Sequence, residues 1–331
     1  MTHITSPKVA LAAGTHTWEP TPESEAFQDE ILQIIRAHGI TKLDTARSYG
    51  MGASETTLGN KNLAAEFAVT TKSPTASRGA GKRENIFAAA KESWDALKTE
   101  KVPFYLLHGP DETVSVEETY SAIQTLYEEG RFEKFGLSNF TREQVLEYYN
   151  HAKVHNLILP TIYQASYSPA VRLNETLLFP TLRELGISIQ AYSPMAGGFL
   201  SRTASELTSP AKGGKWDPEM PVGKFYRTLF FKPSYLAFLK EWEKLVNESG
   251  VSRVGLAYRW VRYHSVLKGE LGDEMIIGAS SARQFEEALI EIEKGPLEGW
   301  VVDRIEAFWE GVKADAEVDH LRAFRAVFLG Y

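Results

Sequence analysis

The sequence predicts an α/β protein that folds as a (β/α)8 TIM barrel in a single domain, and three observations predict it. Short β-like runs alternate with amphipathic helical stretches along the chain, which is typical of parallel strands joined by crossover helices. A length of 331 residues suits one closed barrel with insertions. The first expected strand ends in G-T-H-T-W at residues 14–18, not in the G-x-G-x-x-G motif of open dinucleotide-binding sheets.

Eight short runs are the expected strands, at residues 9–13, 42–44, 67–71, 104–107, 134–137, 161–164, 187–191 and 275–277. Helical periodicity predicts the main crossover helices, at residues 24–38, 83–97, 116–129, 142–153, 175–185, 235–247 and 282–292. The second of these helices carries apolar side chains at the three–four spacing of a buried face, namely Phe87, Ala90, Trp94 and Leu97.

Two segments do not follow the strand–helix alternation. Glycines and prolines gather among polar residues after the seventh strand, which predicts a long functional loop at about 199–233. A C-terminal segment at about 296–331 follows the last expected crossover helix. With these two additions, residues 1–331 are expected to form one barrel domain.

Composition excludes several classes of function. The chain has no cysteine, so disulfides, Cys-ligated zinc, iron–sulfur clusters and thiol nucleophiles are excluded. A formal net charge of −7 gives no basic footprint for nucleic acid. No apolar run approaches the ~18 residues of a membrane span, and the run at 9–13 is too brief for a secretory segment. We therefore expect a cytoplasmic protein with no nucleic-acid, membrane or metal partner.

Four chemically versatile side chains follow the expected strands at the end where active sites of such barrels form. Asp44 ends the second strand with Tyr49 shortly after it, Lys72 follows the third strand, and His108 follows the fourth. A neighbouring aspartate keeps a buried lysine charged, and that cation is expected to lower the pKa of the tyrosine toward the range of a general acid. A histidine can orient a carbonyl oxygen, so the set can protonate oxygen while another agent delivers hydride to carbon.

A structural interpretation competes with this chemical one. Asp44 and Lys72 taken alone are more simply a buried ion pair, and His108 taken alone is a core histidine. The presence of all four side chains at successive strand ends favours the chemical interpretation.

Six motifs occur in order along the chain: D-T-A-x-x-Y-G-x-G-x-S-E at residues 44–55, T-K at 71–72, L-H at 107–108, G-x-S-N at 136–139, Y-S-P at 192–194 and G-A-S-S at 278–281. Together they resemble the aldo-keto reductase superfamily, and the resemblance runs from Gly14 to about Phe308. Within the superfamily the chain looks closest to the aflatoxin-aldehyde reductase branch, through residues 179–183, 196–200, 267–269 and 295–298.

The resemblance implies a barrel that binds NADPH without a Rossmann motif and reduces aldehydes or ketones to alcohols by hydride transfer. It implies that Tyr49 donates the proton, that Lys72 and Asp44 tune it, and that His108 positions the substrate carbonyl. The residues it assigns to the cofactor are Ser138, Asn139 and Gln164 at the nicotinamide carboxamide, Tyr192 against the ring, Ser193, Met195 and Gly197 along the pyrophosphate, and Ser280, Arg283, Gln284 and Glu287 at the adenosine end.

Five residues are hypothesised to contact a small-molecule carbonyl substrate. Trp18, Phe225 and Phe230 are expected to form walls of an apolar pocket, although loop packing explains each of them as well. Arg227 and Arg325 lie in segments that resemble the substrate loop and the chain end of the branch.

The resemblance leaves two other functions open, and it also suggests an oligomeric state. One alternative is a redox-sensing regulatory subunit of the potassium-channel beta type. The other is a biosynthetic aryl-alcohol or polyketide ketone reductase, which would differ in its loops rather than in the four strand-end residues. Relatives in the branch favour a homodimer over a monomer.

Overall fold

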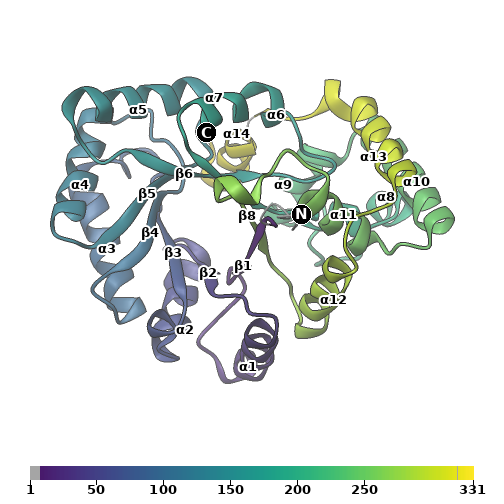
Figure 1. Ribbon diagram of the computed structural model, residues 1–331, viewed down its shortest axis with the longest axis horizontal. Helices are drawn as coiled ribbons and strands as arrows, with labels where there is room; N and C mark the ends of the chain where they lie inside the picture. Colours follow the sequence, from purple (N-terminus) through teal and green to yellow (C-terminus); the bar gives the residue numbers. More distant parts are fainter. Residues whose placement is uncertain (1–7, 319) are drawn as a thin grey trace, which may run out of the picture.

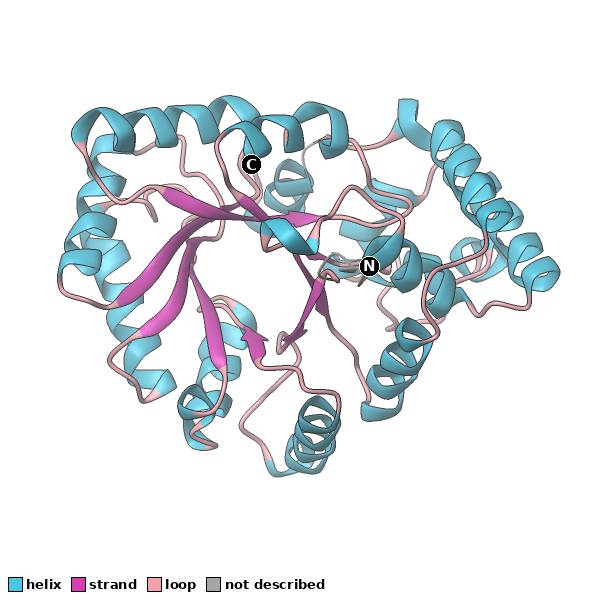
Figure 2. Ribbon diagram, viewed as in Figure 1, coloured by secondary structure: helices cyan, strands magenta, loops and turns pink. Residues whose placement is uncertain are grey.

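The computed structural model describes residues 8–318 and 320–331, so residues 1–7 and 319 of the expected domain lie outside the described residues. Its strands form one closed, parallel barrel in sequence order, which confirms the predicted fold class. The strands make an inner layer with helices outside it (Figures 1 and 2). The strands are β1 (Ala10–Gly14), β2 (Lys42–Asp44), β3 (Ala68–Ser73), β4 (Val102–Leu107), β5 (Phe132–Ser138), β6 (Pro160–Ser166), β7 (Ser188–Tyr192) and β8 (Glu274–Ile277).

The barrel closes because β1 pairs with β2 on one side and with β8 on the other. Ala13 lies opposite Leu43 of β2, and Ala10 lies opposite Glu274 of β8. All neighbouring strands run parallel, so their carboxyl ends meet at one mouth of the barrel. The polar residues that follow the strands in sequence are thereby brought together.

The α-helices are α1 (Pro22–Ala37), α2 (Ala53–Asn60), α3 (Arg83–Leu97), α4 (Val116–Glu128), α5 (Arg142–His155), α6 (Asn174–Leu177), α7 (Phe179–Glu184), α8 (Ala204–Thr208), α9 (Pro221–Phe230), α10 (Pro233–Ser249), α11 (Arg253–Tyr263), α12 (Ala282–Glu293), α13 (Gly299–Val312) and α14 (His320–Phe324). Short 3₁₀ turns are η1 (Tyr49–Gly52), η2 (Leu63–Ala65), η3 (Ala196–Ser201), η4 (Gly269–Leu271) and η5 (Lys313–Asp315), and a π turn, η6 (Arg325–Leu329), follows α14.

Local sequence signals set several helix starts. Ser115 caps α4 by accepting a hydrogen bond from the Glu118 amide, and Thr141 forms a capping box with Gln144 at the start of α5. Ser281 caps α12 in the same way. Each cap satisfies an amide that the first helical turn leaves without a partner.

The buried face of α3 differs by one position from the predicted face. Ala90, Trp94 and Leu97 are buried as expected, but Ile86 is fully buried where Phe87 was expected. Phe87 is only partly buried and lies beneath the Arg83 guanidinium, 4.7 Å from its ring centroid. The helix turns 100° per residue, so one buried stripe cannot hold both neighbours.

Two predicted segments differ from their expected structure: one helix is interrupted, and one loop contains helices. The helix predicted at 175–185 is two short helices, α6 and α7, because Pro180 in the first turn of α7 lacks the amide that a continuous helix needs. The loop predicted at about 199–233 contains α8 and α9. A Thr203–Glu206 capping box starts α8, and Pro221 starts α9.

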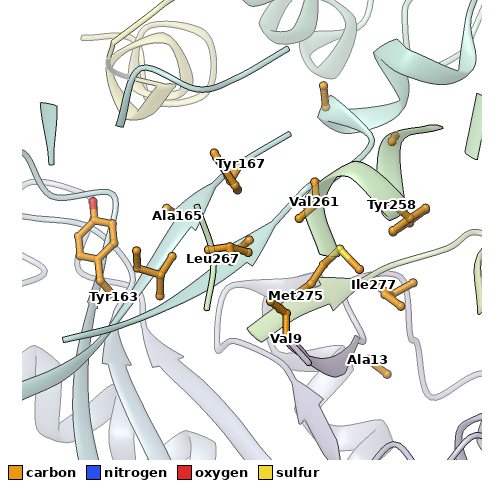
Figure 3. Packing of buried hydrophobic residues seen from close by; sticks show 14 of the residues in the cluster. Val9, Ala13, Tyr163, Ala165, Tyr167, Tyr258, Val261, Leu267, Met275 and Ile277 are labelled. Carbon is orange, nitrogen blue, oxygen red and sulfur yellow. The ribbon is translucent and has the colours of Figure 1, made fainter. Parts of the chain in front are cut away.

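The hydrophobic core lies between the outer face of the strands and the helices. Figure 3 shows Met275 and Ile277 of β8 facing Tyr258 and Val261 of α11. All four side chains are buried, which fixes α11 against the barrel. Among the described residues, no helix has both the length and the apolar character needed to cross a membrane.

Candidate active site

The four predicted strand-end side chains meet at the mouth of the barrel. Lys72 Nζ donates to Asp44 Oδ2 at 2.8 Å and to the Thr45 carbonyl at 2.7 Å, and it lies 3.4 Å from the Tyr49 hydroxyl. The ring centroids of Tyr49 and His108 are 5.7 Å apart. The lysine side chain is fully buried, and the aspartate nearly so. A buried ion pair therefore lies directly beneath a phenol and an imidazole.

Burial dominates the protonation of this group. It lowers the pKa of Lys72, a shift that the Asp44 charge partly offsets. Burial and the Asp44 charge also raise the pKa of Tyr49 well above 10. The expectation that Lys72 lowers the pKa of Tyr49 is therefore wrong for the free protein, because desolvation of the phenolate outweighs the nearby cation. Burial lowers the pKa of His108 to about 3, which keeps the imidazole neutral.

The imidazole of His108 is oriented by one side chain. Its Nδ1 atom lies 3.1 Å from the Ser48 hydroxyl. The other ring nitrogen, Nε2, is then the one available to a molecule in the cavity. A neutral imidazole with one nitrogen already paired can make a single directed hydrogen bond at the second.

A strained turn carries Tyr49. Residues 50–52 all have left-handed backbone, with φ of 56°, 54° and 95°. Arg47 Nη2 donates to the Met51 carbonyl at 3.0 Å, and Arg47 Nη1 donates to the buried Glu55 carboxylate at 2.9 Å. The left-handed region costs energy for a residue with a side chain, so Met51 needs outside support. The Arg47–Glu55 pair supplies that support.

A cavity of about 420 Å³ opens above these groups. Tyr49 and His108 line it directly, whereas Lys72 and Asp44 are buried beneath. One wall comes from α9 and the other from the C-terminal segment, through Phe225, Tyr226, Leu229, Phe230, His320, Leu321, Phe324 and Leu329. Within the part of the chain that the structure describes, no group of three or more His, Asp or Glu side chains could hold a metal ion.

Residues 10–310 match the model of the Aldo/keto reductase family. The chain belongs to this family. Oxidoreductase sirO of Leptosphaeria maculans is 45% identical over 287 residues, which cover 87% of each chain. The human protein aflatoxin B1 aldehyde reductase member 2 is 34% identical over 320 residues, covering 92% of this chain and 87% of that protein. The resemblance found in the sequence motifs is thereby confirmed.

A solved structure has the same fold as this aldo/keto reductase. It is an aldo-keto reductase from Klebsiella pneumoniae in complex with NADPH, with a TM-score of 0.67 and 19% sequence identity. The match covers 92% of this chain and 96% of that chain. At this level of identity the likeness concerns the barrel architecture.

Several residues that the sequence assigned to the nicotinamide lie beside the cavity of this aldo/keto reductase. Asn139, Gln164 and Tyr192 line it, and Ser138 is buried next to Asn139. The Tyr192 hydroxyl donates to Asn139 Oδ1 at 2.8 Å. A second cavity of about 500 Å³ shares Asn139 and Tyr192 with the first, together with Ser166, His320 and Leu321.

The segment after β7 approaches the same cavity. Ser193 and Gly197 line it, whereas Met195 packs partly buried against the core. Ser193, Ala196 and Gly197 have left-handed φ values of 56°, 50° and 66°. A Cβ atom at Gly197 would lie 2.0 Å from the Tyr226 ring, so the close approach of α9 requires glycine there.

The four predicted adenosine residues lie apart from the cavity, at the exposed start of α12. Ser280 Oγ donates to Gln284 Oε1 at 2.9 Å, and Arg283 pairs with Glu287 at 2.9 Å. The helix cap is Ser281, directly before the helix start that periodicity predicts. These side chains form two exposed polar pairs at the start of the helix.

The predicted substrate residues separate into two groups. Phe225 and Phe230 line the cavity. Trp18 does not line it: its side chain is 1% exposed and packs in the core, so the expectation of a pocket wall is corrected to core packing. Arg227 donates to the Leu207 carbonyl at 2.8 Å and its guanidinium lies 3.6 Å from the Phe231 ring centroid, outside the cavity lining.

Arg325 also lies outside the cavity lining. Its Nε atom donates to the Ala76 carbonyl at 2.8 Å, and the guanidinium also bonds the Pro110 carbonyl and Glu112. Tyr331 accepts a hydrogen bond from the Arg78 amide at 3.0 Å. The two contacts attach the C-terminal segment to the loop after β3.

Sequence reasoning missed several residues that line the cavity. His16 lies with its ring 4.7 Å from that of Tyr49, and burial lowers its pKa. It follows β1 in the same way that His108 follows β4, so the strand-end rule could have found it. Leu321 and Leu329 had no comparable signal, because only the tertiary packing of the C-terminal segment brings them to the mouth.

Proposed function

We propose that this protein reduces aldehydes or ketones to alcohols with NADPH, and that Tyr49 is the proton donor. The observation that carries the proposal is the buried Lys72–Asp44 pair beneath a protonated phenol at the bottom of a cavity. Family membership supports it independently.

The residues around the cavity fit a nicotinamide cofactor. Tyr192 offers an aromatic face, and aromatic stacking would fix which side of a planar ring meets the substrate. Asn139 and Gln164 bring amide groups to the same edge. When bound, NADPH supplies the hydride that reduces the carbonyl carbon.

The site's own residues handle the proton. Tyr49 holds its proton until a carbonyl oxygen that is gaining negative charge comes within reach. Lys72, 3.4 Å from the phenol, then stabilises the tyrosinate, and Asp44 balances the lysine charge. His108 Nε2 orients the carbonyl oxygen as a neutral donor. The phenol recovers its proton from solvent after the product leaves.

The cavity lining favours uncharged, apolar or aromatic substrates. Within the described residues, no Lys, Arg, Asp or Glu side chain lines it, and both Arg227 and Arg325 are bonded to backbone carbonyls elsewhere. A carboxylate in this cavity would lose its hydration without gaining a counter-ion. Phe225 and Phe324, by contrast, offer ring faces and edges to an aromatic compound.

A substrate panel tests the proposal. NADPH consumption is measured with a set of aldehydes that includes para-formylbenzoate and its methyl ester. We expect turnover of the ester, with kcat/KM for the carboxylate lower by about tenfold or more, because of the uncompensated charge. No turnover of any aldehyde by protein that binds NADPH tightly would overturn the reductase proposal and favour the regulatory subunit. Equal rates for the two benzaldehydes would overturn only the substrate class.

A further inference from the structure

A chain of polar side chains crosses the interior of the barrel, where apolar packing is the rule. Lys42 pairs with Glu274 at the end opposite the active-site mouth. Gln190 Nε2 donates to Glu274 Oε2 at 3.0 Å, and Gln164 Nε2 donates to Gln190 Oε1 at 3.1 Å. Gln164 Nε2 also donates to Asp44 Oδ1 at 2.8 Å, beside the buried lysine of the active site. We call these five side chains the polar row.

The strand register makes the polar row possible. Gln164, Gln190 and Glu274 are direct neighbours on β6, β7 and β8, so all three point to the same face. The neighbours of Glu274 and Ile276 on β1 are Ala10 and Ala12. These small residues leave space for long side chains of β8 and β2 to meet across the barrel.

Donors and acceptors in the polar row can be arranged in only one way. Glu274 and Asp44 are carboxylates in ion pairs, so each can only accept hydrogen bonds. Gln190 must therefore turn its amide nitrogen to Glu274 and its oxygen to Gln164. Gln164 then uses both of its N–H groups, one on Gln190 and one on Asp44.

The Gln164 carbonyl oxygen is the part of this amide left for a ligand. It accepts no hydrogen bond from the described residues, and Gln164 lines the cavity. We propose that Gln190 and Glu274 are positioning residues that hold this oxygen toward the cavity, so that the site selects a ligand group that donates N–H, such as a primary carboxamide. The inference rests on the proposed function, because the nicotinamide of NADPH carries that carboxamide.

Binding of two cofactors tests the inference without turnover. Quenching of tryptophan fluorescence is titrated with NADP⁺ and with its acetylpyridine analogue, in which a methyl group replaces the carboxamide nitrogen. In Gln190→Met, a straight apolar side chain removes one of the two hydrogen bonds that orient the Gln164 amide. We expect affinity for NADP⁺ to fall by about threefold to tenfold, the loss of one hydrogen bond, while affinity for the analogue stays the same.

The control and a second variant separate positioning from a folding defect. Ser188→Ala lies two residues before Gln190 on β7, outside the polar row, and should leave both affinities unchanged. Glu274→Gln keeps the side-chain volume but lets the amides reverse, so it should weaken NADP⁺ selectively as well. Equal weakening of both cofactors, or no change in either, would overturn the inference. Failure of the unaltered protein to bind NADP⁺ would instead overturn the proposed function on which the inference rests.

Discussion

The Tyr49 phenol keeps its proton in the free protein because burial and the Asp44 charge both raise its pKa. A phenol with a high pKa is a poor base and a stable store for one proton. Its proton becomes mobile only when a substrate oxygen gains negative charge next to it. In the proposed reaction, Lys72 therefore acts after the proton transfer, by stabilising the tyrosinate, rather than before it.

Replacement of the phenol by a plain ring tests this role. Tyr49→Phe removes one hydroxyl and keeps the aromatic packing against His16 and His108. We expect kcat for an aldehyde to fall by about 10²- to 10⁴-fold, as for loss of a general acid, with NADPH affinity within about twofold of the original. Steady-state kinetics and fluorescence titration measure the two quantities. Substantial remaining turnover would show that another group supplies the proton.

The neutral state of His108 predicts a pH dependence of stability. Its pKa in the folded protein is about 3 against an ordinary value of 6.5, so between these pH values the unfolded chain binds a proton that the folded chain does not. The contribution of His108 to stability is thus complete above pH 6.5 and is lost as the pH falls toward 3. Urea unfolding at several pH values should show a steeper acid loss for the unaltered protein than for His108→Gln. Parallel curves would contradict the shifted pKa.

At the scale of elements, the turn after β2 depends on a partner that precedes it in sequence. Arg47 bonds both the Met51 carbonyl and Glu55, and so holds three left-handed residues in place. Met51 itself is 92% exposed, so packing does not fix it. The orientation of Tyr49, the proposed general acid, therefore depends on a surface turn held by one guanidinium.

Loss of this guanidinium should affect chemistry more than binding. In Arg47→Met we expect kcat to fall by about tenfold through a misplaced phenol, with a smaller change in NADPH affinity. Arg47→Lys should restore part of the rate, since it keeps the charge beside Glu55. Arg36→Met, which removes an exposed pair with Glu66 on the surface, serves as the matched control. A rate equal to that of the unaltered protein would exclude Arg47 as a support of the turn.

The C-terminal segment is an element whose arginine acts as an anchor. Arg325 bonds Ala76 and Pro110 carbonyls, so its removal should loosen the wall that holds Phe324 and Leu329. We expect Arg325→Met to raise KM about severalfold for para-formylbenzoate and for its methyl ester alike. A rise confined to the carboxylate would instead indicate direct contact between Arg325 and substrate.

At the scale of the whole molecule, hydrophobic periodicity predicted the strands, and the residues at the strand ends predicted the site. The eight strands are short runs bounded by turns, and β1 to β8 all lie where these runs predict. Asp44 and Lys72 lie at the ends of β2 and β3, and His108 directly follows β4, so their meeting at the mouth follows from the barrel topology. The directions of side chains on loops did not follow in this way.

Trp18, Arg227 and Arg325 show why. Each lies in a segment that approaches the mouth, but each side chain can turn to either of two environments. Trp18 packs in the hydrophobic core, and both arginines donate hydrogen bonds to backbone carbonyls. Such choices depend on partners far away in sequence. The same holds for the pKa of Tyr49, since desolvation is set by everything packed around it.

The buried charges also bear on the stability of the whole fold. Lys72→Met leaves the Asp44 carboxylate buried without its cation, and we expect the free energy of unfolding to fall by about 3–5 kcal/mol. Adding Asp44→Asn removes that charge and should restore part of the loss. Urea unfolding of the two single variants and the double variant gives the coupling energy. Strictly additive losses would show that the pair contributes nothing as a pair.

The alanines of β1 have an evolutionary consequence. Ala10 and Ala12 face the space that Lys42 and Glu274 fill, so a larger residue on β1 would exclude a long one on its neighbours. Exchange of Glu274 for an apolar residue would likewise leave Lys42 without a partner. Positions on the first, second and last strands should therefore vary together among descendants of this gene, although some 230 residues separate Lys42 from Glu274.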